Sequence, residues 1–174
     1  MEIYVVRHGE TEDGKNKIIA DIEEPLNNNG IQQAKNISKE LCDLNIDVVY
    51  YSPIERVKHT LKLFNLSNNI PTIIEERLKE RNMGIYENTK FDDLDWEEFW
   101  GYDSEQKYFE LESMKNVYQR VSSFLDELKL KEKNKKVLLV THGGVARAIY
   151  WYFNGVDKSL FKCDNCKIYK YIIN

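Results

Sequence analysis

The sequence predicts an α/β protein, a three-layer α/β/α sandwich around a mostly parallel central sheet. Short apolar runs alternate along the chain with longer segments whose apolar residues recur at helical spacing, which is typical of this class. The runs are continuous because the strands of a parallel sheet are buried on both faces. Two of them, residues 3–6 and 137–140, are each followed within three residues by a histidine and a glycine.

The length and charge of the chain narrow its class. A chain of 174 residues is typical of one domain, here residues 1–174, with a single sizeable core. The formal charge of −4 provides no basic surface for nucleic acid. No apolar run reaches the roughly 18 residues that span a membrane, and the N-terminus shows no signal-peptide pattern.

The cysteine content indicates the compartment. Three cysteines are too few for a disulfide framework and favour a reducing environment, so we expect a cytoplasmic protein. Cys163 and Cys166 form a C-x-x-C pair near the C-terminus. Because a zinc site needs more ligands than this pair supplies, we expect no metal and interpret the cysteines as bordering the last strand.

The first strand, residues 3–6, leads into a polar stretch over residues 12–24 that we interpret as a loop. A helix follows, for which Asn27 is the expected N-cap. One face of this helix should pack on the sheet, because apolar residues recur at helical spacing: Ile31, Ala34, Ile37, Leu41 and Leu44.

The second strand, residues 48–51, runs directly into Ser52 and Pro53. A serine followed by proline is a typical helix start, so we expect Ser52 to cap the next helix. Arg56 then lies in the first helical turn. Since helical side chains lean back toward the helix N-terminus, Arg56 should overhang the carboxyl end of the second strand.

The remaining elements continue the alternation: a strand over residues 70–74, a charged loop over 75–84, a helix over 115–130, the strand over 137–140, a helix from about 145 to 153, and a final strand over 167–173. Residues 88–112 are acidic and aromatic, and residues 92–112 hold nine acids and one lysine. We expect a lid-like segment whose field repels highly charged anions. The alternative is a solvated peripheral excursion anchored by its aromatic side chains.

The two histidines that follow strands suggest a binding site. Ligands of open α/β sheets bind at the carboxyl ends of the strands. If the two strands are parallel neighbours, His8 and His142 reach the same edge, where Arg7 and Arg56 make the pocket cationic. Two guanidinium groups favour phosphate, and Gly143 opens a helix whose N-terminus adds backbone donors.

A histidine in such a pocket could act as a nucleophile. Its pKa is about 6.5 in water, and neighbouring positive charge favours the neutral ring. The ring could attack phosphorus and become phosphohistidine, while the other cations stabilise the phosphoryl oxygens. A leaving alkoxide needs a proton, and Glu80 is the candidate donor. The nearby acids Glu75, Glu76 and Glu87 remain alternatives.

These motifs together resemble the histidine phosphatase superfamily, also called phosphoglycerate mutase-like. R-H-G-E-T at residues 7–11 and T-H-G-G at residues 141–144 are the strongest similarities. Weaker ones follow in the family's order, at residues 25–34, 52–60, 78–84 and 165–166. The resemblance covers most of the chain except about residues 88–110.

The resemblance implies His8 as the phosphorylated nucleophile, Glu80 as the proton donor, and neither a metal nor an organic cofactor. It also implies that the phosphate is bound by Arg7, Arg56 and His142, and we add Thr11 and Gly143 as substrate-binding candidates. Two departures stand out. Gly14 occupies the place of a pocket asparagine, which Asn16 is expected to replace. Residues 111–113 read L-E-S instead of G-E-S.

The implied function is a phosphomonoesterase of the histidine acid phosphatase type that acts on a small phosphorylated metabolite. Family members of this size include the α-ribazole phosphatases, so a nucleoside-like 5′-phosphate is the leading substrate. Three alternatives remain: a cofactor-dependent phosphoglycerate mutase, a phosphohistidine-protein phosphatase, and a non-catalytic phosphate-binding module. The sequence leaves the oligomeric state open.

Overall fold

A computed structural model describes residues 1–104, 107–156 and 161–173. Its centre is a five-stranded sheet of order β3-β2-β4-β1-β5. The strands are β1 (Glu2–Arg7), β2 (Val48–Tyr51), β3 (Thr72–Ile74), β4 (Lys136–Thr141) and β5 (Ile168–Ile172). All neighbouring strands pair in parallel except β5, which is antiparallel to β1. The predicted fold class is therefore confirmed.

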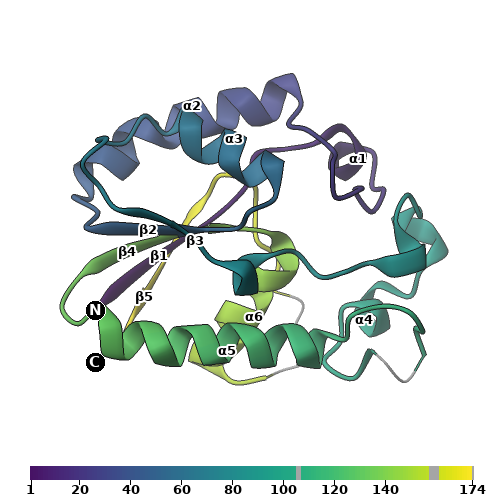
Figure 1. The fold of residues 1–174 in the computed structure, drawn as a ribbon. Coiled ribbons are helices and arrows are strands. Elements are labelled where there is room, and N and C mark those ends of the chain that lie inside the picture. The colour runs from purple at the N-terminus through teal and green to yellow at the C-terminus, as the bar shows by residue number, and fades with distance from the viewer. Residues whose placement is uncertain (105–106, 157–160, 174) are drawn as a thin grey trace.

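Helices cover both faces of the sheet (Figure 1). Helices α2 (Asn28–Asp43) and α3 (Glu55–Leu63) lie on one face, and α5 (Met114–Lys131) and α6 (Gly143–Asn154) on the other. Alternate residues of one strand enter different cores: Ile3 and Val5 pack with α5 and α6, whereas Tyr4 and Val6 pack with α2 and α3. Both faces of the strand are buried, which explains its continuous apolar run.

Helices α2 and α5 each begin directly after a side chain that caps the helix N-terminus. The Asn27 side chain accepts from the backbone N–H of Gly30 and caps α2 as predicted, and Ser113 caps α5 in the same way through the N–H of Asn116. These side-chain oxygens satisfy N–H groups that have no partner within the helix.

Ser52, in contrast, is not a helix cap, and this prediction was wrong. Helix α3 begins at Glu55 with Ile54 at its N-cap position. The N–H of Ser52 donates to Val140 O at 3.1 Å, which prolongs the ladder between β2 and β4. Ser52 therefore remains extended at the sheet edge, and the chain turns into the helix only after Pro53.

The polar stretch after β1 also differs from the prediction. It contains a short helix, α1 (Glu12–Lys15), which Thr11 caps through the N–H of Gly14. The charged loop after β3 contains two 3-10 turns, η1 (Glu76–Leu78) and η2 (Gly84–Tyr86). The second strand has the predicted bounds, and the other predicted elements occur with ends shifted by no more than two residues.

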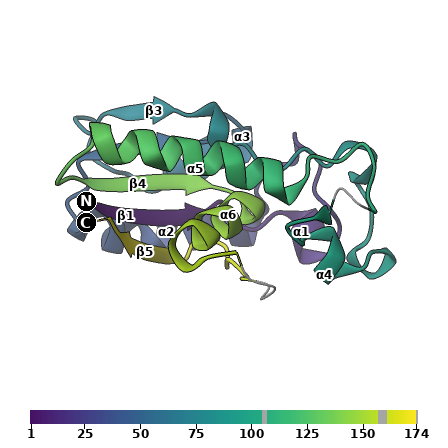
Figure 2. The ribbon, with the colours of Figure 1, turned by 90° about the horizontal axis from the view of Figure 1, so that it is seen from below.

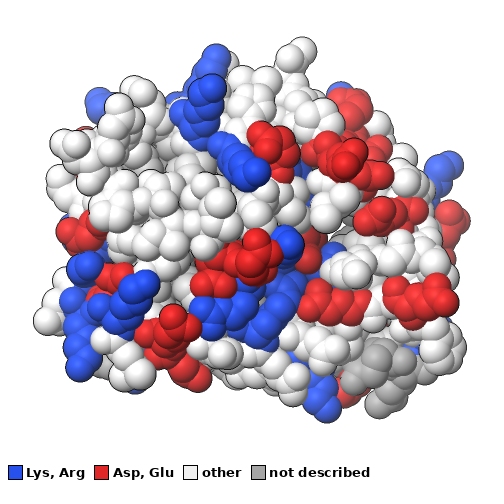
Figure 3. Space-filling view, in the orientation of Figure 1, with Lys and Arg blue, Asp and Glu red and all other residues white. Residues whose placement is uncertain are grey.

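The acidic-aromatic segment continues through η3 (Phe91–Asp93) and α4 (Trp96–Phe99). Figure 2 places α4 and α1 beyond the carboxyl ends of β1 and β4. Phe99 and Trp100 are buried, while acidic residues such as Asp92 and Glu97 are exposed. In Figure 3, which has the orientation of Figure 1, acidic side chains gather on the right, the side where α1 and α4 lie. Residues 105 and 106 of the predicted lid lie outside the described residues. Among the described residues, no helix has the length and apolar character to cross a membrane.

Candidate active site

Three neighbouring parallel strands deliver polar residues to one edge of the sheet. Arg7 pairs with Thr141 in the register of β1 and β4, so the next residues of the two strands are His8 and His142. Their ring centroids lie 5.1 Å apart, with 63° between the ring planes. The convergence that the sequence suggested is therefore present in the structure.

The His8 ring is held in one tautomer. Its Nδ1 lies 2.7 Å from the carbonyl oxygen of Gly9. Because a carbonyl only accepts hydrogen bonds, Nδ1 carries the hydrogen, and Nε2 of the neutral ring keeps a free lone pair.

The backbone around His8 is fixed from several sides. Its N–H donates to Thr141 O at 2.9 Å, and its carbonyl accepts from Asn165 Nδ2 at 2.8 Å. The N–H of Gly9 donates to Thr60 Oγ1 at 3.1 Å. A Cβ at Gly9 would lie only 2.4 Å from Gly30 O. Glycine is therefore required where the loop meets α2, and this close contact sets the position of His8.

His142 contributes a buried nitrogen that faces no protein acceptor. Its Nε2 lies 2.8 Å from Ser52 Oγ. Its Nδ1 has no hydrogen-bond partner among the described residues. The preceding Thr141 donates through Oγ1 to Leu78 O at 2.8 Å, which ties β4 to the loop after β3.

Arg7 and Arg56 are each positioned by backbone carbonyls. Arg7 Nη1 donates to Cys163 O at 3.0 Å, and Arg56 Nη1 donates to Asp21 O and Ile22 O at 2.8 and 3.1 Å. The Nε atoms of both arginines are buried without a partner in the described part of the chain. Unsatisfied buried donors are costly, so these groups fit a ligand with several acceptor oxygens.

The electrostatics of the site favour neutral imidazoles beside fixed positive charge. Burial lowers the pKa of His8 well below its usual 6.5, and Arg7 and Arg56 lower it further. The pKa of His142 is likewise lowered, first by burial and then by His8 and the two arginines. Both histidines are therefore uncharged at pH 7, and the neutral His8 ring keeps a lone pair on Nε2.

Glu80 lies at the N-terminus of α6. Its Oε1 and Oε2 accept from the N–H of Gly144 at 3.1 and 3.3 Å, and Oε1 also accepts from the N–H of Arg81 at 2.9 Å. A Cβ at Gly144 would lie 2.6 Å from Glu80 Oε1 and 3.0 Å from the Trp100 ring. The preceding Gly143 lies against the Arg7 guanidinium, so the carboxylate borders the cationic pocket.

Two predicted residues have other surroundings. The Thr11 hydroxyl caps α1 by accepting from the N–H of Gly14 at 3.2 Å. Asn16 is exposed, and its amide lies 3.5 Å from Glu12. In the described residues, neither side chain forms a hydrogen bond with His8, His142, Arg7 or Arg56. Their roles as substrate-binding residues therefore stay predictions.

Several polar residues near the site were not predicted to be there. Ser52 follows β2 directly, as His8 and His142 follow β1 and β4, and the same strand-end rule would have identified it. Arg81 and Arg147 are buried and donate to the carbonyls of Phe99 and Trp100. Arg147 is the one charged residue of a mainly apolar helix, and such an isolated charge could have indicated a buried polar contact.

The C-x-x-C cysteines belong to the surroundings of the site. The carbonyl of Cys163 accepts from Arg7, and the N–H of Cys166 donates to Arg7 O at 3.0 Å. The two side chains pack in the two different cores. No cluster of three or more potential metal ligands occurs in residues 1–104, 107–156 and 161–173.

Comparison with known proteins gives consistent results. The family description "Histidine phosphatase superfamily (branch 1)" matches residues 3–174. Phosphoserine phosphatase 1 of Hydrogenobacter thermophilus is 30% identical over 95% of this chain and 83% of its own. The metal-independent phosphoserine phosphatase of Arabidopsis thaliana is 34% identical over 86% of this chain and 67% of its own.

A solved structure agrees with these relatives. The α-ribazole phosphatase of Shigella flexneri superposes with a TM-score of 0.83 at 27% identity, covering 100% of this chain and 91% of that one. A family description that matches nearly the whole chain, together with the paired strand-end histidines, determines the assignment. The chain belongs to the histidine phosphatase superfamily.

Proposed function

We propose that the protein is a phosphomonoesterase that hydrolyses a small organic phosphate through a phosphohistidine at His8. The observation that carries this proposal is the buried group of donors around the two adjacent imidazoles. Arg7 Nε, Arg56 Nε and His142 Nδ1 have no partner in the described chain. A phosphoryl group offers acceptor oxygens to both guanidinium groups while its phosphorus faces the lone pair of His8. It can also accept from His142 Nδ1 in the tautomer whose Nε2 accepts from the Ser52 hydroxyl.

In the first step, Nε2 of His8 attacks phosphorus and the bond from phosphorus to the ester oxygen breaks. The two arginines and His142 bind the phosphoryl oxygens and stabilise the charge that redistributes over them. Glu80, in its protonated form, gives its proton to the departing alkoxide. The products of this step are an alcohol and phosphohistidine.

In the second step, water attacks the phosphohistidine. Glu80, now a carboxylate, accepts a proton from this water, and the bond between Nε2 and phosphorus breaks. Inorganic phosphate leaves, and His8 and Glu80 return to their starting states. His8 needs no metal for this chemistry, because the neutral imidazole already holds the attacking lone pair.

The relatives support hydrolysis of a small metabolite and suggest two substrate classes. The similarity to an α-ribazole phosphatase supports a nucleoside-like 5′-phosphate such as α-ribazole 5′-phosphate. The two phosphoserine phosphatases support a phosphorylated amino acid. A phosphoglycerate mutase is the second candidate function, because a probable mutase of Shigella dysenteriae is 29% identical over 82% of this chain. Turnover of a panel of such metabolites separates these possibilities.

Three broader features complete the proposal. We infer that residues 1–174 act as one domain, with residues 88–112 as the lid beside Glu80. The three cysteines are free thiols, in keeping with a reducing cytoplasm. Glu80 argues against a phosphohistidine-protein phosphatase, because a histidine leaving group needs less help from an acid.

Replacing the proposed nucleophile should abolish turnover. His8→Ala removes the attacking lone pair, so we expect no hydrolysis of p-nitrophenyl phosphate and no acid-labile phosphoenzyme in rapid-quench labelling. The matched control is His59→Ala, since His59 is the third histidine of the chain and lies on α3 outside the pocket. Retained activity of His8→Ala would assign the nucleophile to another group.

The two pocket arginines should each contribute strongly to the rate. Arg7→Ala and Arg56→Ala each remove a donor to the phosphoryl group, and we expect a loss of about 10²–10³ in kcat. Steady-state kinetics with p-nitrophenyl phosphate measures this loss. A decrease of less than about tenfold would place that arginine outside the group that stabilises the transition state.

The effect of removing the proposed acid on kcat should depend on the leaving group of the substrate. Glu80→Gln should lower kcat for an alkyl phosphate by about 10²–10⁴, the range for general acid catalysis, but lower it far less for p-nitrophenyl phosphate, whose leaving group needs no proton. Glu76→Gln is the control, because Glu76 is exposed and pairs with Lys79. Equal losses on both substrates would exclude Glu80 as the acid.

The buried histidines should make stability depend on pH. Their folded-state pKa values lie below the unfolded value, so the unfolded chain binds more protons as the pH falls. The contribution of the two histidines to the free energy of unfolding is complete above about pH 6.5. Below this pH the free energy of unfolding should decrease by up to about 1.4 kcal/mol per pH unit for each histidine. Urea unfolding without phosphate, from pH 7.5 to 5.5, measures this decrease. An equal slope in His8→Ala would contradict it.

A further inference from the structure

We propose that the ion pair between Arg120 and Glu112 is a positioning device for Glu80. This inference rests on the proposed function, in which Glu80 is the proton donor. In the described part of the chain, neither residue of the pair forms a hydrogen bond with His8 or His142. The pair acts instead on the backbone of residues 77–82, the loop that carries Glu80.

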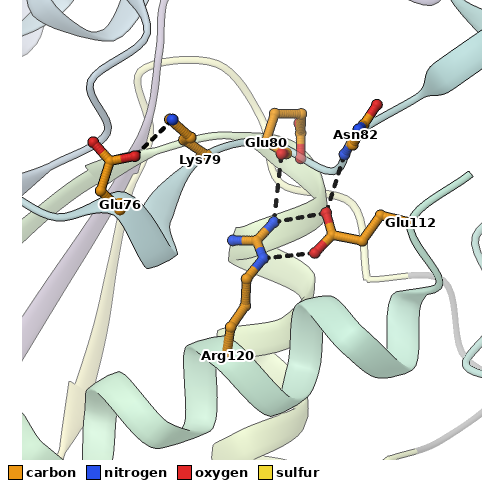
Figure 4. A pocket seen from close by; sticks show the side chains of 6 residues that line it. All are labelled: Glu76, Lys79, Glu80, Asn82, Glu112 and Arg120. Atoms are coloured by element: carbon orange, nitrogen blue, oxygen red, sulfur yellow. Dashed lines mark hydrogen bonds and ion pairs between the residues drawn. The ribbon is translucent and has the colours of Figure 1, made fainter.

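The pair has the two-point geometry of a strong guanidinium–carboxylate contact. Arg120 extends from α5, with Nε 2.8 Å from Glu112 Oε1 and Nη2 3.1 Å from Oε2 (Figure 4). Both side chains are 21% exposed. A parallel, partly buried fork of this kind fixes direction as well as distance, which an exposed single contact does not.

The same two side chains hold the loop on both sides of Glu80. Arg120 Nη1 donates to Arg77 O, and Nη2 lies 3.4 Å from Glu80 O. Glu112 Oε2 accepts from the N–H of Asn82 at 3.0 Å, and the N–H of Glu112 donates to Asn82 O at 2.9 Å. Residues before, at and after the proposed acid are therefore bound to one ion pair.

The loop depends on this support because its outer side is not packed. A hollow of about 370 Å³ lies there, and it is lined by Glu76, Lys79, Glu80, Asn82, Glu112 and Arg120 (Figure 4). On the inner side, Leu78 is buried and its carbonyl accepts from Thr141 Oγ1. The start of the loop is thus anchored to β4, and Arg81 is anchored to Phe99 O. On the outer side, the contacts to the backbone of residues 77, 80 and 82 come from Arg120 and Glu112.

Glu112 also prevents a competing contact. An arginine beside the loop could pair with the Glu80 carboxylate and draw it away from the N–H of Gly144. In the structure, Glu112 occupies Nε and Nη2 of Arg120, and the guanidinium reaches Glu80 only at its carbonyl oxygen. The carboxylate stays at the N-terminus of α6, where a misplacement of about 1 Å can cost about 10² in rate.

The experiment measures kcat for an alkyl phosphate and for p-nitrophenyl phosphate in Arg120→Ala, Glu112→Gln, Glu80→Gln and the double variant Glu80→Gln/Arg120→Ala. We expect Arg120→Ala to lower kcat about tenfold or more with the alkyl substrate and less than about threefold with the aryl one. Because Arg120 acts through Glu80, the double variant should lose no more alkyl activity than Glu80→Gln alone.

Glu112→Gln keeps the shape of the pair but removes its charge, so it provides the same test if Arg120→Ala does not fold. The matched control is Arg77→Ala, since Arg77 lies in the same loop and pairs with Glu75 and Glu127 at 29% exposure. It should lower the urea midpoint without changing the ratio of alkyl to aryl activity.

The outcomes separate the two proposals. A selective loss in Glu80→Gln with an equal loss on both substrates in Arg120→Ala, or additive losses in the double variant, would overturn the positioning role and leave Glu80 as the acid. An unselective loss in Glu80→Gln would remove the acid role, and the positioning role with it. Selective, non-additive losses would support both.

Discussion

The parallel pairing of β1 with β4 is the constraint on which the site depends. Residues of opposite ends of the chain, Arg7 and Thr141, face each other in this register, and the next peptide N–H, that of His8, still donates to Thr141 O. A shift by one residue would turn every side chain of the strand to the other face. The same register that buries the apolar residues of β1 in two cores therefore also sets the distance between the two imidazoles.

The fold and the histidine pair were predictable because they depend on local patterns. Continuous apolar runs identify strands that are buried on both faces, and a side chain that follows such a strand must emerge at its edge. Asn27 could be assigned because an N-cap needs only the next three residues. The histidines required one additional assumption, that the two strands are neighbours, and the sheet order satisfies it.

The remaining details depend on contacts between distant segments. Helix α1 has four residues and none of them is buried, so no apolar periodicity predicted this helix. Thr11 and Asn16 are its N-cap and C-cap residues, and their surroundings were therefore not predictable. Ser52 was assigned to a cap because Ser-Pro often starts a helix, but its N–H continues the ladder to β4. Arg81 and Arg147 donate to the backbone carbonyls of Phe99 and Trp100, and because every residue has a carbonyl, no sequence pattern identifies such partners.

The hydrogen-bond partners of the arginines fit their proposed roles. Arg7 and Arg56 are positioned by carbonyl oxygens of Cys163, Asp21 and Ile22. A carbonyl satisfies a donor without neutralising the guanidinium, so the positive charge remains available to an anion. A carboxylate partner in the same place would compete with phosphate for both the charge and the hydrogen bonds.

Arg120 shows the opposite solution. Its charge lies near Glu80, where a free guanidinium would bind the proposed acid and compete with the N–H of Gly144. Pairing with Glu112 neutralises that charge. The other hydrogen bonds of the guanidinium go to the backbone carbonyls of Arg77 and Glu80. In the proposed function, Arg7 and Arg56 bind an anion, whereas Arg120 fixes a loop. The partners of these three guanidinium groups, neutral carbonyls in the pocket and a carboxylate behind the loop, fit these two proposed roles.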